Sequence, residues 1–197
     1  MKEKERKIGV IGAGGRSRLL EHITNKHQGI KISSVFDPDK ECSKSLINAT
    51  HSLDAKICGR YEDVIEDKNC EWIAVFSPNH CHKEHIIAAF EAGKHVFAEK
   101  PLATSIDDCK AIYEAHKKTS LLFATGFVLR YSPLYKKVKE ILESGEIGKI
   151  LSIDANENIA PDHGSYIMKN WRRLAKFAGP HILEKCCHDL DLLNWFI

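Results

Sequence analysis

Glycines at the spacing of a phosphate-binding turn come early in the chain, where a G-x-G-x-x-S run begins at Gly12. Gly12 permits a tight turn, Gly14 lets the main chain approach a pyrophosphate, and Ser17 is small enough for a helix to pack on a strand. The following helix would direct free N–H groups and its positive dipole end at the phosphates. Arg16, or its neighbour Arg18, offers a charge-assisted contact to the same groups.

An acidic side chain, Asp37, follows roughly twenty residues after this turn, at the end of a second apolar segment. A carboxylate there accepts both ribose hydroxyls of adenosine and repels a 2′-phosphate, which favours NAD over NADP. Two other interpretations stay open: a glycine turn beside a solvent-facing aspartate, or a site for a flavin or a methyl donor.

A lysine follows a third apolar segment, in Glu99-Lys100-Pro101. We expect it at the carboxyl edge of a parallel sheet, where the nicotinamide end of a dinucleotide lies. Lys100 would hydrogen-bond a hydroxyl or carbonyl oxygen and stabilise negative charge that develops on it. By itself the segment is more typical of a surface lysine at the start of a loop.

A carboxylate and an imidazole recur late in the chain, at Glu184 and His188. On a continuous helix this i, i+4 spacing places both on one face, where the carboxylate orients the imidazole. They are also compatible with a purely structural pair. Adjacent Cys186 and Cys187 point in different directions on a helix, and no second ligand pair completes a tetrahedron, so no metal is expected.

The elements that position these residues alternate between strand and helix over about the first 125 residues, which predicts an α/β fold with a doubly wound parallel sheet. We assign residues 1–125 to a Rossmann domain that binds NAD(P) and residues 126–197 to the start of a second, open-sheet α/β domain. The strands are expected at 7–11, 30–36, 72–76, 95–98 and 121–125, and the helices at 16–26, 40–48, 61–66, 83–92 and 105–118.

The second region has a different rhythm. Helices are predicted over 133–144 and 183–197 and a strand over 149–158, with an irregular polar segment from 160 to 180. The apolar helical stretch that ends at Ile197 has no helix-stop residue, and one strand is too few for a stable sheet. We therefore expect the second domain to be incomplete, and these residues alone to be inactive in catalysis.

Composition excludes several classes of protein. The chain has 197 residues, 43% of them hydrophobic and 28% charged, which is typical of a soluble globular protein. A net charge of +2 does not favour nucleic acid as a partner, and no apolar run is long enough to span a membrane. Seven irregularly spaced cysteines without a C-x-x-C motif indicate reduced thiols and a cytoplasmic location.

Taken together, the motifs resemble the glucose–fructose oxidoreductase/inositol dehydrogenase/MocA family. Besides the turn at Gly12 and Asp37, the matching segments are Ser77-Pro78-Asn79 with His82, Ala92-Gly93-Lys94-His95-Val96, Glu99-Lys100-Pro101-Leu102-Ala103, Gly126-Phe127 with Arg130, Gly145-Glu146-Ile147-Gly148, Trp171-Arg172, and His188-Asp189 with Asp191. The resemblance implies an N-terminal Rossmann domain, a C-terminal domain with a large open sheet, and a homodimer or homotetramer. Family chains run well beyond 300 residues.

The resemblance also implies roles for individual residues. His188 is the acid/base, Lys100 supports it, and Glu184 stands where the family has aspartate. The cofactor would be held by Gly12, Gly14, Gly15, Arg16, Ser17, Asp37, Ser77, Pro78, Asn79, His82, Glu99 and Lys100. The substrate would contact His188, Arg130, Trp171, Arg172 and, less directly supported, His163. Three segments depart from the family pattern: Glu184, Ala178-Gly179-Pro180 and Lys185-Cys186-Cys187. These departures affect the expected substrate more than the expected fold.

The implied activity is hydride transfer between nicotinamide and a hydroxyl-bearing carbon of a sugar, polyol or related compound. Two alternatives remain. One is a non-catalytic protein that senses NAD, against which Lys100 and His188 both argue. The other is a lyase or glycosidase that oxidises its substrate transiently and then reduces it again.

Overall fold

The structure is a computed structural model that describes residues 5–27 and 29–197, apart from the side chains of Asp162 and His163. Contacts between residues divide the chain into two compact units, Met1–Thr125 and Gly126–Ile197. We describe each unit by itself. No helix in the described residues is long and apolar enough to cross a membrane.

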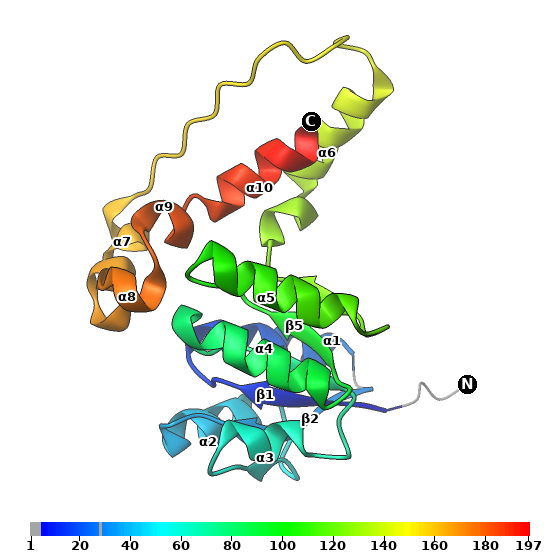
Figure 1. The fold of residues 1–197 in the computed structure, drawn as a ribbon, viewed down its shortest axis with the longest axis vertical. Helices are drawn as coiled ribbons and strands as arrows, with labels where there is room; N and C mark the ends of the chain where they lie inside the picture. Colours follow the sequence, from blue (N-terminus) through cyan, green and yellow to red (C-terminus); the bar gives the residue numbers. More distant parts are fainter. Residues whose placement is uncertain (1–4, 28) are drawn as a thin grey trace. The chain divides into compact units, whose positions relative to one another are not determined.

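The first unit alternates strands with helices (Figure 1). Its strands are β1 (Arg6–Ile11), β2 (Ile30–Phe36), β3 (Lys56–Ile57), β4 (Trp72–Val75), β5 (His95–Ala98) and β6 (Phe123–Thr125). Its helices are α1 (Leu19–Lys26), α2 (Lys40–Ala49), α3 (Tyr61–Ile65), α4 (His82–Glu91) and α5 (Ile106–Lys117), with 3-10 turns η1 (Gly15–Arg18) and η2 (Asn79–Cys81).

The six strands form one parallel sheet in the order β3-β2-β1-β4-β5-β6. This is the doubly wound order, in which the chain reverses direction across the sheet between β1 and β4. The predicted parallel α/β fold is therefore confirmed. The carboxyl ends of these strands lie along one edge, and the loops after β1, β2, β4 and β5 carry the predicted cofactor residues.

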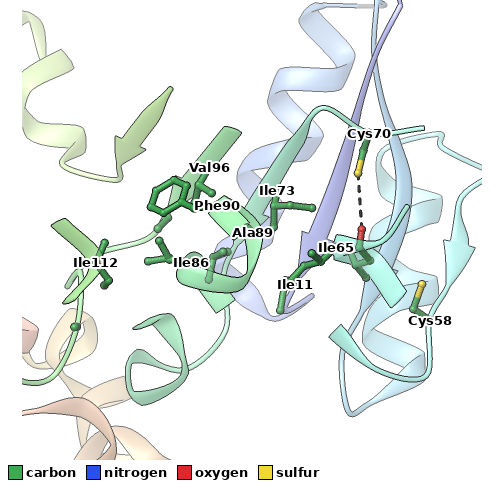
Figure 2. Packing of buried hydrophobic residues seen from close by; sticks show 14 residues of the cluster. Ile11, Cys58, Ile65, Cys70, Ile73, Ile86, Ala89, Phe90, Val96 and Ile112 are labelled. Atoms are coloured by element: carbon green, nitrogen blue, oxygen red, sulfur yellow. Dashed lines mark hydrogen bonds between the residues drawn. The ribbon is translucent and has the colours of Figure 1, made fainter. Parts of the chain in front are cut away.

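Alternate residues of each strand point to opposite faces of the sheet, so that it has two cores. On β1, Ile11 packs with α3, α4 and α5, whereas Val10 packs with α1 and α2. On β4, Ile73 joins the first core and Ala74 the second. Figure 2 shows the first core, in which Ile86 and Phe90 of α4 lie among strand residues. Helices thus cover both faces of the sheet, and the predicted polar site residues lie at its carboxyl edge.

The second unit is helical in the residues that the structure describes. It contains η3 (Val128–Tyr131), α6 (Pro133–Ser144), α7 (Pro161–Gly164), η4 (Ser165–Met168), η5 (Asn170–Arg173), α8 (Ala175–Ala178), α9 (His181–Glu184) and α10 (Cys187–Phe196). Helix α6 has the predicted bounds, with Pro133 in its first turn and Gly145 beyond its end at φ 78°.

Two predictions for this unit are wrong. Residues 149–158 form no strand, because no neighbouring segment in the described residues pairs with them, and a strand needs such a ladder. The helix predicted over 183–197 is interrupted at Lys185 and Cys186, between α9 and α10. Glu184 and His188 therefore belong to different helices, and the helical i, i+4 argument for pairing them fails.

Candidate functional site

The turn after β1 has the geometry that the glycine spacing predicts. Gly12 has φ 93°, and a Cβ atom there would lie 2.6 Å from main-chain atoms of Phe76 and Ser77. A side chain at Gly12 would thus collide with the end of β4. By contrast, no atom lies within 4 Å of the Cβ positions of Gly14 and Gly15, so this side of the turn has open space for a diphosphate. The turn fits a dinucleotide.

Ser17 closes the same turn from inside the protein. It is fully buried, and its hydroxyl donates to the Gly14 carbonyl oxygen at 2.7 Å. A larger residue would push η1 away from the sheet. The expectation that Ser17 is the small residue of the motif agrees with this packing.

Asp37, the residue predicted to bind the adenosine ribose, also stabilises the glycine turn. The Ala13 N–H donates to Asp37 Oδ2 at 2.7 Å, and the Asp39 N–H donates to Asp37 Oδ1 at 2.9 Å. The carboxylate thereby ties the end of β2 to the loop after β1. A carboxylate has about four lone-pair positions, so both oxygens retain capacity for ribose hydroxyls.

Glu99 and Arg16 form an ion pair that joins two loops distant in sequence. Glu99 is 4% exposed, and its Oε1 accepts from Arg16 Nη2 at 2.7 Å and Nε at 3.1 Å. Its Oε2 accepts from the Lys100 N–H at 3.2 Å. The guanidinium predicted to contact phosphate is thus engaged by Glu99, and through it Arg16 fixes the main chain at Lys100.

His82 fastens the loop after β4 to the loop after β5. It is 1% exposed, with Nδ1 2.8 Å from the Pro101 carbonyl oxygen and Nε2 2.9 Å from the Ser77 carbonyl oxygen. Burial lowers the pKa of His82, and these carbonyls together with Glu99 oppose that shift. His82 therefore positions the loops on either side of the site, while neighbouring Asn79 is buried and Pro78 half-buried.

A residue that the motif analysis missed, His85, supports Ser77. Its Nδ1 lies 2.9 Å from the Ser77 hydroxyl, and its ring packs 4.3 Å from that of Tyr61. Burial lowers the pKa of His85 to about 4, so the ring is neutral at neutral pH. Its position three residues after His82, on the same face of α4, was the available indication.

In the second unit, several charged and aromatic side chains lie close to one another near Tyr166. Arg172 Nε lies 3.5 Å from Glu184 Oε1, and the Arg172 guanidinium stacks 4.3 Å from the Trp171 ring and 5.5 Å from that of Tyr166. Lys185 Nζ lies 5.7 Å from the same Tyr166 ring. The structure thus brings together Trp171 and Arg172, two of the predicted substrate residues, with the predicted catalytic residue Glu184.

The other predicted residues of this unit have separate surroundings. The His188 ring packs edge-on against Phe127, with centroids 6.0 Å apart. Arg130 makes a two-pronged ion pair with Asp191, at 2.7 and 2.6 Å, which gives it a structural role. The side chain of His163 lies outside the described residues. Across those residues, no group of three or more His, Cys, Asp or Glu is arranged to hold a metal.

Comparison with known proteins agrees with this geometry. Residues 6–127 match an oxidoreductase family with an NAD-binding Rossmann fold, and residues 139–197 match the C-terminal alpha/beta domain of the same family. Inositol 2-dehydrogenase of Salmonella typhimurium is 30% identical over 194 residues, which are 97% of this chain and 54% of that enzyme. The 2,7-anhydro-N-acetylneuraminate hydratase of Escherichia coli is 30% identical over 190 residues, which are 94% of this chain and 48% of the hydratase.

A solved structure extends the likeness to the fold. The crystal structure of myo-inositol dehydrogenase from Lactobacillus casei, in complex with NAD(H) and myo-inositol, matches with a TM-score of 0.80 and 27% identity, over 97% of this chain and 54% of that one. The chain spans about half the length of the relatives it matches. The first match includes the glycine turn, Asp37 and Lys100, the second includes Glu184 and His188, and the chain belongs to the glucose–fructose oxidoreductase/inositol dehydrogenase/MocA family of oxidoreductases.

Proposed function

We propose that the protein is a dehydrogenase that uses NAD, in preference to NADP, to oxidise a CH–OH group of a sugar or polyol. The observation that carries this proposal is the edge of the first unit's sheet. There the loops after β1, β2 and β5 present the open glycine turn, Asp37 and Lys100, and Arg16 with Glu99 ties the first of these loops to the last.

The first unit would hold the cofactor. The main chain at Gly14 and Gly15 would receive the diphosphate, and Asp37 would accept the adenosine ribose hydroxyls. The pairs that Ser77 and Glu99 make would keep the loops after β4 and β5 in place. When bound, NAD supplies the acceptor for the hydride that leaves the substrate carbon.

The substrate's proton and oxygen would be handled by this chain's own side chains. His188 would accept the hydroxyl proton as general base, and Lys100 would stabilise negative charge on the oxygen. Glu184 would bind a substrate hydroxyl, Arg172 would contact the substrate beside it, and Trp171 would form an apolar wall. We assign Arg130 to the ion pair with Asp191 instead of to substrate.

A panel of sugars and polyols, followed by NADH absorbance, tests the proposal in the purified full-length protein. We expect turnover with at least one compound, and a fall in kcat/KM of about 100-fold or more in Lys100→Ala and in His188→Ala. NADH fluorescence serves as the control for intact cofactor binding. Tight NADH binding without turnover of any compound would instead indicate an NAD sensor.

A second function is favoured by one relative, the hydratase named above. A lyase-type reaction would oxidise the substrate on bound NAD and reduce it again before release. Product would then form without net accumulation of NADH, and catalytic amounts of NAD would suffice. Chromatography of the reaction mixture with substoichiometric NAD distinguishes this reaction from a dehydrogenase.

We also propose that the protein acts in the cytoplasm as a homodimer or homotetramer. All seven cysteines are free thiols, which supports a reducing compartment. The oligomeric state is supported by the family resemblance. Light scattering coupled to gel filtration measures it directly, and a monomer at micromolar concentration would contradict it.

A further inference from the structure

A lysine that is buried along most of its side chain lies beside the residues that we assign to substrate. Lys185 is 7% exposed, at the break between α9 and α10, directly after Glu184 and three residues before His188. Its Nζ faces the Tyr166 ring, on which Arg172 also packs. We call Tyr166, Arg172, Glu184 and Lys185 the Tyr166 cluster. All four belong to the second unit.

The Tyr166 cluster contains more positive than negative charge. Its cations are Lys185 and Arg172, and its carboxylate is Glu184, whose side chain is 5% exposed. Within the described residues, no carboxylate lies in ion-pair distance of Lys185, and the Tyr166 ring is the partner seen for its Nζ. Partial removal from water makes a cation without a counter-charge costly, and an anionic ligand would offset that cost.

Arg172 has unused hydrogen-bonding capacity. Its contact with Glu184 is a single approach of 3.5 Å, whereas Arg130 and Asp191 of the same unit form a two-pronged pair at 2.6 and 2.7 Å. The N–H donors of a guanidinium with so long a contact remain available to bind a planar anion such as a carboxylate or a tetrahedral anion such as a phosphate. The lysine adds a point charge to the same anion.

From this arrangement we propose that the substrate is an anionic sugar, whose carboxylate or phosphate group binds Lys185 and Arg172. The inference rests on the proposed function and narrows its substrate class. Lys185 is thus a specificity-determining residue, and Glu184, which neutralises one of the two cations, limits the site to one negative group.

Three compounds that differ only at C6 test the proposal: glucose, glucuronate and glucose 6-phosphate. The affinity of each for the NADH-loaded protein is measured by calorimetry, and kcat/KM by NADH absorbance. We expect one of the two anions to bind about tenfold more tightly than glucose at low salt, and to lose that advantage at high salt. Preference for the carboxylate or for the phosphate identifies the source of the charge.

Variants separate Lys185 from a general effect of positive charge. Lys185→Gln is expected to remove most of the preference for the anion, and Lys185→Arg to retain part of it. The matched control is Lys176→Gln, which removes an exposed ammonium that lies 4.7 Å from the Phe177 ring, and we expect it to leave the preference unchanged. Thermal unfolding checks that each variant folds. The salt dependence of binding is measured on the unmodified protein, so it tests the proposal even if a variant does not fold.

The outcomes distinguish the two proposals. Charge-dependent binding without oxidation of any sugar supports the anion site and contradicts the dehydrogenase. Oxidation of neutral sugars with no gain from a C6 anion, or an anion preference that survives Lys185→Gln, overturns the anion site and leaves the dehydrogenase standing.

Discussion

The two units hold their polar side chains in different ways. In the first, a six-stranded sheet with two cores supports Glu99 and His82. Glu99 accepts hydrogen bonds from Arg16, 83 positions away, and His82 pairs with the Pro101 carbonyl oxygen, 19 positions away. In the second, the described residues form short helices, and the cations Arg172 and Lys185 lie against aromatic rings. Rigid support is appropriate for a cofactor that all members of a family bind. Side chains with few long-range contacts are easily replaced in evolution, which is appropriate for a substrate that differs between members. The following predictions test this contrast.

The largest expected effect comes from Gly12→Ala in the first unit. The added Cβ meets the main chain of Phe76 and Ser77, directly after β4, at 2.6 Å, in a backbone conformation that alanine disfavours. We expect a loss of about 4 kcal/mol in the free energy of unfolding, together with loss of NADH binding. Denaturant unfolding and NADH fluorescence measure these. Gly93→Ala, also at positive φ but in open space, is the control and should cost about 1 kcal/mol.

The Arg16–Glu99 pair tests whether the first unit depends on long-range ties. Arg16→Gln leaves a carboxylate buried without its cation, and we expect it to cost about 3 kcal/mol in unfolding free energy. Glu99→Gln leaves an arginine that water can solvate, so its cost should be smaller. Lys44→Gln, in the exposed pair with Glu41, should change stability by less than about 0.5 kcal/mol. Equal effects of Arg16→Gln and Glu99→Gln would contradict the argument.

A pH titration probes the buried histidines of the first unit. The pKa of His85 is lowered to about 4, whereas an unfolded histidine titrates near about 6.5. Between these values the unfolded chain binds more protons, so stability falls as the pH falls from about 6.5 to about 4. We expect the wild type to lose about 1.6 kcal/mol more than His85→Gln between about pH 6.5 and pH 5. His22→Gln, at an exposed site, should behave as wild type; parallel curves for wild type and His85→Gln would refute the assignment.

The smallest effect is expected in the second unit, at the pair between Arg130 and Asp191. Its carboxylate is mostly buried and its guanidinium is more exposed, so Arg130→Gln should cost about 1.5 kcal/mol. Hydrogen exchange of the α10 amides measures this loss locally. Lys137→Gln, in the exposed pair with Glu140, is the control and should have almost no effect. A cost above that of Arg16→Gln would reverse the proposed contrast between the units.

The same contrast explains what could be predicted from the sequence. Strands β2 and β5 have the predicted bounds because short segments rich in β-branched and aromatic residues, bordered by turn residues, are typical of strands. Ser105 caps α5 as expected, accepting from the Asp108 N–H. Strand β3 was missed because its two residues at the sheet edge are too few to form a pattern.

Errors arose where tertiary contacts decide the structure. The alternating residues 149–158 meet the local requirement of a strand, but strand formation depends on a partner that no local pattern reveals. The interruption at Lys185 was equally invisible, since the surrounding residues favour helix. In the site, the types and spacing of Gly12, Asp37 and Lys100 were informative, whereas the pairing of Arg16 with Glu99, across 83 positions, was not.

The double role of Asp37 has a consequence for changing the cofactor. Engineering a preference for NADP would begin by replacing this acidic residue, which repels a 2′-phosphate. Here the same carboxylate receives the Ala13 N–H and organises the phosphate turn. Exchange of Asp37 alone would therefore weaken the binding of both dinucleotides. Evolution toward NADP along this lineage needs a compensating hydrogen-bond acceptor for Ala13 before, or together with, the change in charge.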